Sequence, residues 1–418
     1  MFFASPVSST RAGVQLRLEP AEAEAFILTL AEALHAHGAA AHRLEGMLTL
    51  VARRLGTEAR FYSTPTAVMV SFGQVVEGRT CLLRVQPGAI DLEKLSLLYE
   101  TTVSVIRGEL GPEAGRVRVA VIVSAPPRHG AAAIILSFAF SSAAAAVLFG
   151  GGAPEVATSG AVGLLVGVIE RAASRWAAGS SVVEPLAAAV AAVAAPLAAR
   201  VVGPLSTLIV TLAGVVMLLP GLAITTAMTE LATRNLASGT ARFAGALVRL
   251  LGLGFGVALG AGLVALLPPL PPPPPVTESS APALAAAVLV AALAASAFLQ
   301  ARPRDLGWIL AAGGLGFAGT RLGARPLGPE LGAFAGAVLL GLSSNAFARA
   351  LDRPAAVLLV PGLILLVPGS IGLRSVFSLL ENDIVSGVEA AFKMVLVSTA
   401  LAAGLLFANI ALPPRRAL

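Results

Sequence analysis

The sequence is poor in the residues on which most soluble enzymes rely. Its single cysteine, Cys81, excludes an internal disulfide and has no second cysteine nearby for a metal or redox pair. The N-terminal part contains no glycine-rich phosphate loop, nucleophile elbow or supported carboxylate pair. Only 12% of the 418 residues are charged, against roughly a quarter in an ordinary soluble domain. With 56% hydrophobic residues, the chain cannot be soluble throughout.

Charge is distributed unevenly along the chain. Residues 1–129 hold 25 Asp, Glu, Lys and Arg residues, whereas residues 130–418 hold 27 in more than twice the length. The sequence therefore predicts a soluble N-terminal head, residues 1–129, and a membrane region after it. The net charge of +6 comes mostly from arginines at the ends of apolar runs, which is not a nucleic-acid-binding pattern. Because no apolar signal sequence starts the chain, we expect the head to stay on the side of synthesis.

The head combines helix and strand patterns. Apolar residues at helical spacing predict helices from Pro20 to Gly38 and from Leu44 to Gly56. Residues 59–63, 67–73 and 80–86 alternate or are β-branched, which predicts three antiparallel strands. Asp91 is expected to cap a further helix that ends near Gly108. The valine-rich segment 117–123 fits either a strand or part of a last helix that begins near Pro112.

Three of the four histidines, His35, His37 and His42, lie close together in the head. His35 and His37 are two residues apart on a predicted helix, so their side chains point in different directions. We therefore expect ordinary surface histidines and no metal site.

Apolar runs follow the head, most of them long enough to cross a bilayer. A proline-rich linker, residues 269–282, contains five consecutive prolines and separates five runs from five. We expect two five-helix membrane units, residues 130–268 and 283–418. The ten runs lie near residues 131–149, 157–169, 182–199, 203–221, 243–267, 283–300, 306–320, 328–348, 354–372 and 390–411.

Arginines border the predicted membrane helices unevenly. With the head and both termini in the cytoplasm, ten arginines fall inside and four outside, as the positive-inside rule favours. Because five is odd, the second unit then crosses the bilayer in the opposite sense to the first. This predicts a predominantly α-helical, polytopic membrane protein with two inverted repeats and a small cytoplasmic α+β head. The inside group is Arg171, Arg175, Arg234, Arg242, Arg302, Arg304, Arg349, Arg353, Arg415 and Arg416, and the outside group is Arg200, Arg321, Arg325 and Arg374.

A pattern repeats between the two units. Pro220-Gly221 precedes Ser238-Gly239, and Pro368-Gly369 precedes Ser386-Gly387, with 18 residues from proline to serine in both. A Pro-Gly pair can simply end a helix. It can also interrupt a membrane helix so that freed backbone groups face a cavity, as in transporters. The sequence leaves both readings open, and the pairing across the two units favours the second.

Small and charged residues within the runs have simpler interpretations. Gly252, Gly256 and Gly260, like the glycines between 313 and 319, are spaced for close helix packing. Glu389 and Lys393 are four residues apart on one helix, so we expect them to pair.

Several motifs occur in a characteristic order: Ala41-His42-Arg43-Leu44-Glu45 and Tyr62-Ser63-Thr64-Pro65-Thr66 in the head, then Leu219-Pro220-Gly221, Ser238-Gly239-Thr240-Ala241-Arg242, Asn345, Arg353-Pro354 and Val367-Pro368-Gly369-Ser370-Ile371-Gly372. In these motifs the chain resembles the threonine/serine exporter family, in the form that carries both membrane units in one polypeptide. The resemblance covers nearly the whole chain. The valine-rich segment after Pro112 departs from the helical pattern expected of the family.

The resemblance implies a multi-pass protein of a bacterial cytoplasmic (inner) membrane that exports threonine and serine. Related two-chain proteins imply small dicarboxylates such as succinate as an alternative substrate. The lack of a nucleotide-binding motif favours an ion gradient as the energy source, with protons the expected coupling ion. No enzyme activity, cofactor or metal is expected. A membrane sensor or regulator with a ligand-binding head is the rival of another class, and a passive channel and a homo-oligomer are left open.

The predicted substrate site lies between the two units. Backbone groups freed at Pro220, Gly221, Pro368 and Gly369 would bind the carboxylate and ammonium groups of the substrate. We expect the first pair near the inner face and the second near the outer face, as two gates. The other candidate residues are Thr225, Thr226, Ser238, Gly239, Arg242, Asn345, Ser370, Arg374, Asp383, Ser386, Gly387 and Glu389.

Overall fold

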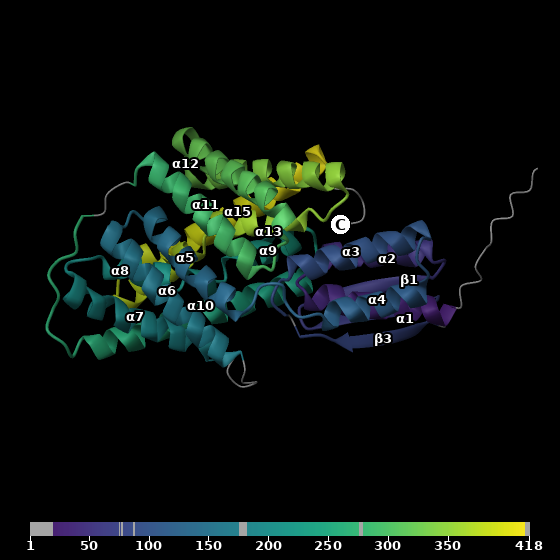
Figure 1. Cartoon of the computed structure of the whole chain (residues 1–418), viewed down its shortest axis with the longest axis horizontal. Helices are drawn as coiled ribbons and strands as arrows, with labels where there is room; N and C mark the ends of the chain where they lie inside the picture. Colours follow the sequence, from purple (N-terminus) through teal and green to yellow (C-terminus); the bar gives the residue numbers. More distant parts are fainter. Residues whose placement is uncertain are drawn as a thin grey trace, which may run out of the picture.

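The computed structural model of the protein describes residues 20–74, 76, 78–86, 88–174, 182–275 and 279–413. These residues are predominantly helical, with one small sheet near the N-terminal end. The described part of the head lies at one end of a bundle of long helices (Figure 1). The prediction of a helical membrane region with an α+β head is confirmed at this level.

The head has the elements that its sequence pattern predicts. Its strands pair antiparallel in the order β1-β2-β3. The side chain of Asp91 accepts a hydrogen bond from the Lys94 N–H, and Gly108 ends that helix in the left-handed conformation. The elements are α1 (Pro20–Ala36), α2 (Ala41–Arg54), β1 (Ala59–Thr64), β2 (Ala67–Phe72), β3 (Arg79–Arg84), α3 (Leu92–Arg107) and α4 (Pro112–Ser124).

The valine-rich segment is helical, which decides the alternative that the sequence left open. Val119 and Ile122 are three residues apart and both are buried, whereas Val117, Val121 and Val123 are exposed. Helix α4 packs against α1, and Gly115 allows the approach because a Cβ there would lie 2.9 Å from the Phe26 ring. Packing at helical spacing therefore prevails over the strand preference of valine.

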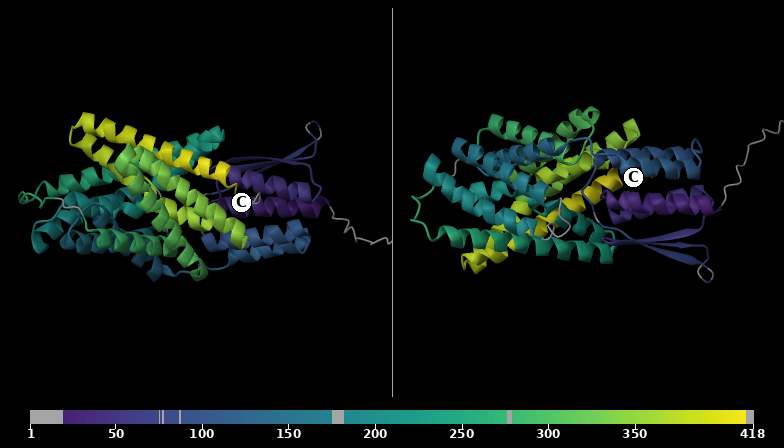
Figure 2. Two further views of the ribbon diagram at one scale, coloured as in Figure 1. Left: turned by 90° about the horizontal axis from the view of Figure 1, so that it is seen from above. Right: turned by 60° about the horizontal axis from the view of Figure 1, so that its bottom comes forward.

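The membrane region consists of helices that run roughly along the long axis of the molecule (Figures 1 and 2). Within the described residues, eight helices are long and apolar enough to cross a membrane, or nine if the bent pair α8 and α9 forms one span. The helices are α5 (Ala131–Leu148), α6 (Ala153–Ala173), α7 (Val183–Val202), α8 (Thr207–Gly214), the 3-10 helix η2 (Val216–Leu218), α9 (Gly221–Ala232), α10 (Leu236–Val264), α11 (Ala281–Phe298), the 3-10 helix η3 (Pro303–Asp305), α12 (Leu306–Leu351), α13 (Ala356–Leu366), α14 (Gly369–Leu380) and α15 (Ile384–Ala411).

Helix α12 is a hairpin of two arms that meet at Gly328. This glycine has φ 85° and ψ 167°, which only glycine adopts easily. A Cβ at Gly323 would lie 3.1 Å from the Cα of Gly332, and one at Gly319 would lie 3.2 Å from the Cα of Gly336. The arms therefore run antiparallel in close contact. The predicted packing role holds for Gly313, Gly316 and Gly319, whereas nothing lies within 4 Å of a Cβ at Gly314.

Two of the predicted membrane runs are shorter than the corresponding helical segments in the structure. The run 203–221 continues through α8, η2 and α9 to Ala232, with a bend of 46° between the two parts. The run 354–372 likewise continues through α13 and α14 to Leu380. In both cases hydropathy marked the apolar stretch correctly, but the predicted run did not include the more polar half beyond the Pro-Gly break.

The head is fixed to one end of the bundle by ion pairs and by a shared apolar core. Arg302 binds Glu100 of α3 at 2.8 Å, and Arg107 of α3 binds Asp352 at 2.7 Å. The proline-rich linker lies at the other end of the molecule, where Arg200 donates a hydrogen bond to the Pro268 carbonyl (Figure 1). The described C-terminal end lies beside the head (Figure 2).

Packing inside the bundle follows the small residues. A Cβ at Gly256 would lie 2.1 Å from the Pro185 carbonyl oxygen, and one at Gly260 would lie 2.6 Å from that of Ala189, so α10 and α7 pack through this glycine face. Glu184 pairs with Arg249 at 3.5 Å. The expected pair between Glu389 and Lys393 is not formed among the described residues, and Glu389 is exposed.

Candidate functional site

The two Pro-Gly breaks meet in the middle of the bundle. Pro220 precedes α9 with φ −78° and ψ 29°, and Pro368 precedes α14 with φ −84° and ψ 33°. A Cβ at Gly369 would lie 3.4 Å from the Cα of Gly221, and one at Gly221 would lie 3.0 Å from the Gly369 nitrogen. The backbones therefore touch where both helices begin. The expectation of one break near each membrane face is wrong, because the two breaks lie against each other.

This arrangement concentrates polar backbone groups in an apolar bundle. The first N–H groups of α9 and α14 have no partners within their helices, and both helix N-termini carry partial positive charge. The carbonyl ends of α13 and of η2, which continues α8, immediately precede these breaks and carry partial negative charge. The centre of the bundle can thus interact with an anionic and a cationic group at once.

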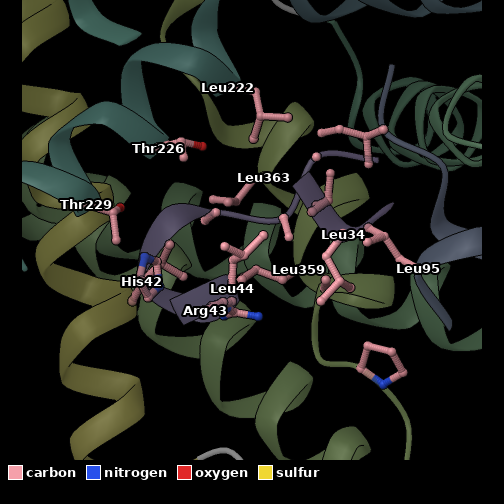
Figure 3. Close-up of a pocket in the computed structure, with 18 of the residues that line it drawn as sticks. Leu34, His42, Arg43, Leu44, Leu95, Leu222, Thr226, Thr229, Leu359 and Leu363 are labelled. Atoms are coloured by element: carbon pink, nitrogen blue, oxygen red, sulfur yellow. The ribbon is translucent and has the colours of Figure 1, made fainter. Parts of the chain in front are cut away.

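A cavity of about 120 Å³ lies between the head and the membrane helices; we call it the head-side cavity. Leu222, Thr226 and Thr229 reach it from α9, and His42, Arg43 and Leu44 reach it from α2 (Figure 3). Leu359 and Leu363 of α13 line it as well. The turn between α1 and α2 thus enters the head-side end of the bundle.

Three polar side chains that line the head-side cavity, Thr225, His42 and Arg43, have groups without a hydrogen-bond partner among the described residues. The hydroxyl of Thr225 is fully buried and has no hydrogen bond, and the same holds for Nδ1 of His42. The guanidinium of Arg43 makes no hydrogen bond or ion pair with any of the described residues, and burial lowers its pKa. The expectation of ordinary surface histidines is wrong for His35, which is buried and whose Nε2 lies 2.7 Å from the Thr64 carbonyl oxygen. His42 is half-buried.

A buried carboxylate joins the head to the bundle next to this cavity. Glu230 of α9 is 0% exposed and accepts hydrogen bonds from Arg242 at 3.1 and 3.2 Å and from the Ser238 hydroxyl at 2.9 Å. It also accepts one from the Ala41 N–H at 3.2 Å, at the first residue of α2. The partial positive charge at the N-terminus of α2 also stabilises the carboxylate of Glu230. We call Glu230, Arg242, Ser238 and Ala41 the junction cluster.

A second cavity, of about 700 Å³, lies at the linker end of the bundle; we call it the far-side cavity. It is lined by parts of α7, α8, α10 and α14 and by the linker residues Pro268 to Leu270. Three pairs of residues that are 148 positions apart in sequence have one member in the lining of each cavity: Thr229 and Phe377, Leu405 and Val257, and Asn409 and Ala261.

The structure does not bring all predicted site residues together. Pro220, Gly221, Pro368 and Gly369 meet at the centre, with Ser370 in the first turn of α14, and Thr225 and Thr226 line the head-side cavity. Ser238 and Arg242 bind Glu230 instead. Asn345 donates to Asn409 Oδ1 and to the Leu412 carbonyl, both at 2.9 Å.

The remaining candidates lie away from both the centre and the head-side cavity. Asp383 caps α15 through the Ser386 N–H, and Arg374 lies over the Phe149 ring at 5.6 Å. Gly239 and Gly387 allow close packing. A Cβ at Gly239 would lie 2.7 Å from Leu231, and a Cβ at Gly387 would lie 2.6 Å from Leu379.

Sequence reasoning missed Glu230 and gave Arg43 no role. Glu230 lies beyond the end of the predicted run 203–221 and was not considered, although an acidic residue within an extended span is itself a signal. Arg43 belonged to a recognised motif but could not be placed, because its position in the cavity depends on how the head docks.

The environment of His42 predicts a pH dependence. Burial, followed by the charge of Arg43, lowers its pKa to about 4, although the charge of Glu230 acts in the opposite direction. A free histidine has a pKa near 6.5, so the unfolded chain binds more protons as the pH falls from 6.5 toward 4. Stability is therefore fully present above pH 6.5 and is lost below it, by roughly 2 kcal/mol at pH 5.

We expect the thermal midpoint of the full-length protein in detergent to fall between pH 7 and pH 5. In a His42→Gln variant the fall should be smaller, because this titration is absent. An identical pH dependence in both proteins would contradict the assignment.

The interrupted helices, the two cavities and the apolar spans together define a multi-pass membrane protein with a docked head. The family described as putative threonine/serine exporter matches residues 25–264, and the family described as threonine/serine exporter, ThrE, matches residues 284–411. The chain belongs to the threonine/serine exporter family.

Similar proteins are found among yeast membrane proteins. The pheromone-regulated membrane protein 10 of Pichia sorbitophila is 24% identical over 88% of this chain and 37% of its own length. Its Candida albicans counterpart is 26% identical over 88% of this chain and 34% of its own length. An uncharacterized protein of Schizosaccharomyces pombe is 26% identical over 57% of this chain and 31% of its own length. The chain thus spans about a third of these relatives, and no solved structure matches it.

Proposed function

We propose that the protein is a secondary transporter that exports small polar metabolites, threonine and serine first among them, by alternating access. The observation that carries this proposal is the contact of the two Pro-Gly breaks between two cavities that lie at opposite ends of the bundle. A transporter of this kind needs one central site and a route to it from each side in turn.

In this proposal the chain crosses the membrane ten times. Each unit, residues 130–268 and 283–418, has four whole spans and one interrupted span, if the two arms of α12 count separately. The linker 269–282 would connect them on the outer side, with the head, residues 1–129, and the C-terminus in the cytoplasm. Support comes from ion pairs of Arg302 and Arg353 near the head, where the positive-inside rule favours arginine.

An inverted repeat relates the two units in this proposal. Beyond the Pro-Gly breaks, Arg234 and Asn382 are 148 residues apart and both have positive φ, 65° and 63°. The Asn235 N–H binds the Glu230 carbonyl and the Asp383 N–H binds the Ser378 carbonyl, both at 2.8 Å. Such matched irregularities in non-glycine residues support a shared origin for the two units.

The central breaks would bind the substrate directly. Its carboxylate would lie at the N-termini of α9 and α14, and its ammonium group at the carbonyl ends of η2 and α13. Opening of the head-side cavity would admit the substrate from the cytoplasm, and opening of the far-side cavity would release it. A gradient of an ion, with protons the expected one, would drive the cycle, in the cytoplasmic membrane of a bacterium.

A dicarboxylate such as succinate is the alternative substrate, and a ligand-sensing head is the alternative of another class. The head contributes about half of the lining of the head-side cavity, so a ligand there would contact head and spans together. In a sensor the membrane helices would only anchor the head, which does not require two cavities at opposite ends.

Counterflow in proteoliposomes tests the proposal. Vesicles loaded with unlabelled threonine should accumulate labelled threonine or serine faster than empty vesicles do, and an imposed proton gradient should change the rate. Succinate serves as the third substrate in the same assay. If none of the three moves faster than in protein-free vesicles, the proposed substrates are wrong.

A further inference from the structure

The head-side cavity carries an unusual combination of groups for a contact between a soluble head and a membrane bundle. Arg43 brings a guanidinium with no partner among the described residues, and its lowered pKa reflects burial. Arg43 is half-buried and lines the cavity, whereas proteins usually pair a charge that leaves bulk water. Arg302, which is buried at the same contact between head and bundle, is paired in this way, because it binds Glu100 at 2.8 Å.

A second group in the same cavity also lacks a partner. Thr225 is 0% exposed, and its hydroxyl has no hydrogen bond although the neighbouring Thr229 hydroxyl donates to the Thr225 carbonyl at 2.9 Å. An unsatisfied buried hydroxyl costs about 1–3 kcal/mol. Arg43 comes from the head and Thr225 from α9, so two separate elements present unused hydrogen-bonding groups to one space.

The charge of the cavity selects the kind of ligand. Its described lining contains one arginine, three threonines, one asparagine and one histidine, and no aspartate or glutamate. Glu230, whose charge acts on His42 of the lining, is already hydrogen-bonded to Arg242, Ser238 and the Ala41 N–H. A single carboxylate would therefore be complementary to the cavity, since guanidinium and carboxylate form strong charge-assisted hydrogen bonds. A second carboxylate would have no cation to bind.

The size of the cavity agrees with a small metabolite. Its volume of about 120 Å³ is close to that of an apolar cavity of about 150 Å³ that binds benzene. That is room for an amino acid with a short side chain and too little for a nucleotide or a peptide. The apolar side chains of Leu222, Leu359 and Leu363 complete the lining, as is usual for small-molecule sites.

We propose that the head forms part of a substrate site, in which Arg43 binds the carboxylate of a small amino acid and the Thr225 hydroxyl forms a further hydrogen bond to it. This inference rests on the proposed function and extends it, because it gives the head a direct part in substrate recognition. It also places a first binding step on the head side of the central breaks. A substrate that enters from this side would meet Arg43 before it reaches Gly221 and Gly369.

The test compares threonine with threoninamide, in which a neutral amide replaces the carboxylate. We expect the wild-type protein to prefer threonine in counterflow, and an Arg43→Gln variant to lose that preference. Its apparent KM for threonine should rise by roughly tenfold to a hundredfold, as is typical when a charged hydrogen-bond partner is removed. Arg53→Gln is the matched control, because Arg53 lies on the same helix but is exposed. Its selectivity should equal that of the wild type.

A second variant separates binding from folding. Thr225→Val keeps the shape of the side chain and removes a hydroxyl that has no protein partner, so the thermal midpoint should stay the same or rise. Its apparent KM for threonine should nonetheless increase severalfold. The inference is overturned if Arg43→Gln retains the preference for threonine, or if Thr225→Val leaves the apparent KM unchanged.

The inference can fail while the proposed function holds. Wild-type counterflow of threonine together with unchanged selectivity in Arg43→Gln would reject only the role of the head. If the wild-type protein transports neither threonine nor serine, the proposed function fails first, and the role of the head in substrate binding fails with it.

Discussion

Replacing Arg242 with alanine should destabilise the protein by about 3 kcal/mol or more. Glu230 is fully buried, and Arg242 is its only charged partner among the described residues. Removing one member of a buried ion pair leaves an uncompensated charge, and such losses typically amount to about 3–5 kcal/mol. The effect should be visible as a lower thermal midpoint of the full-length protein in detergent, and as faster proteolysis of the segment between α4 and α5.

A double variant identifies the cause. Glu230→Gln in the Arg242→Ala background removes the buried charge, so it should restore most of the lost stability. Arg116→Ala is the control for loss of an ion pair as such, because Arg116 pairs with Glu113 on the exposed surface of α4. It should leave the thermal midpoint unchanged. A double variant as unstable as Arg242→Ala alone would contradict the view that the buried charge is responsible.

Replacing Gly221 with valine should abolish transport while the protein still inserts into the membrane. A Cβ at this position would already lie 2.7 Å from Val367 Cγ2 and 3.0 Å from the Gly369 nitrogen, and the two methyl groups of valine add to the clash. Overpacking of this kind costs about 1–3 kcal/mol and displaces backbone. Displacement of the breaks by even a fraction of an ångström would disturb every backbone group that we assign to the substrate.

The expected loss in counterflow rate is at least tenfold for Gly221→Val, and the same holds for Gly369→Val, where a Cβ would lie 2.9 Å from Leu219 Cβ. Gly262→Val is the control, because nothing lies within 4 Å of a Cβ at that position on α10. Normal rates in both Gly221→Val and Gly369→Val would remove the interrupted helices from the mechanism.

Local patterns in the sequence were sufficient for much of the fold. The strands of the head follow from alternation, the helix after Asp91 follows from its cap, and the membrane helices follow from long apolar runs. The Pro-Gly pairs were also found, because Pro220 and Pro368 interrupt apolar runs in the same way. The polar second halves of the interrupted spans were missed, since hydropathy alone does not extend a span across a break.

The candidate site depended on contacts that no local pattern contains. The hydrogen bond between the Ala41 N–H and Glu230 joins residues 189 positions apart, and it exists only when the head is docked. The same docking brings Arg43 and Thr225 to the lining of one cavity. From sequence, Arg43 is simply an arginine on the polar face of a helix, and Glu230 a charge at the end of an apolar run.

The central claim is that the two cavities open in turn, and accessibility of paired cysteines tests it most directly. In a Cys81→Ala background, Thr229→Cys reports on the head-side cavity and Phe377→Cys on the far-side cavity. Each variant that retains counterflow is treated from either side with a membrane-impermeant thiol reagent, with and without threonine.

We predict that Thr229→Cys reacts only from the head side and Phe377→Cys only from the linker side. Threonine should change the two labelling rates in opposite directions, because one cavity closes as the other opens. Labelling of either cysteine from both sides, or a parallel rise at both positions, would contradict alternating access and would indicate a continuous pore.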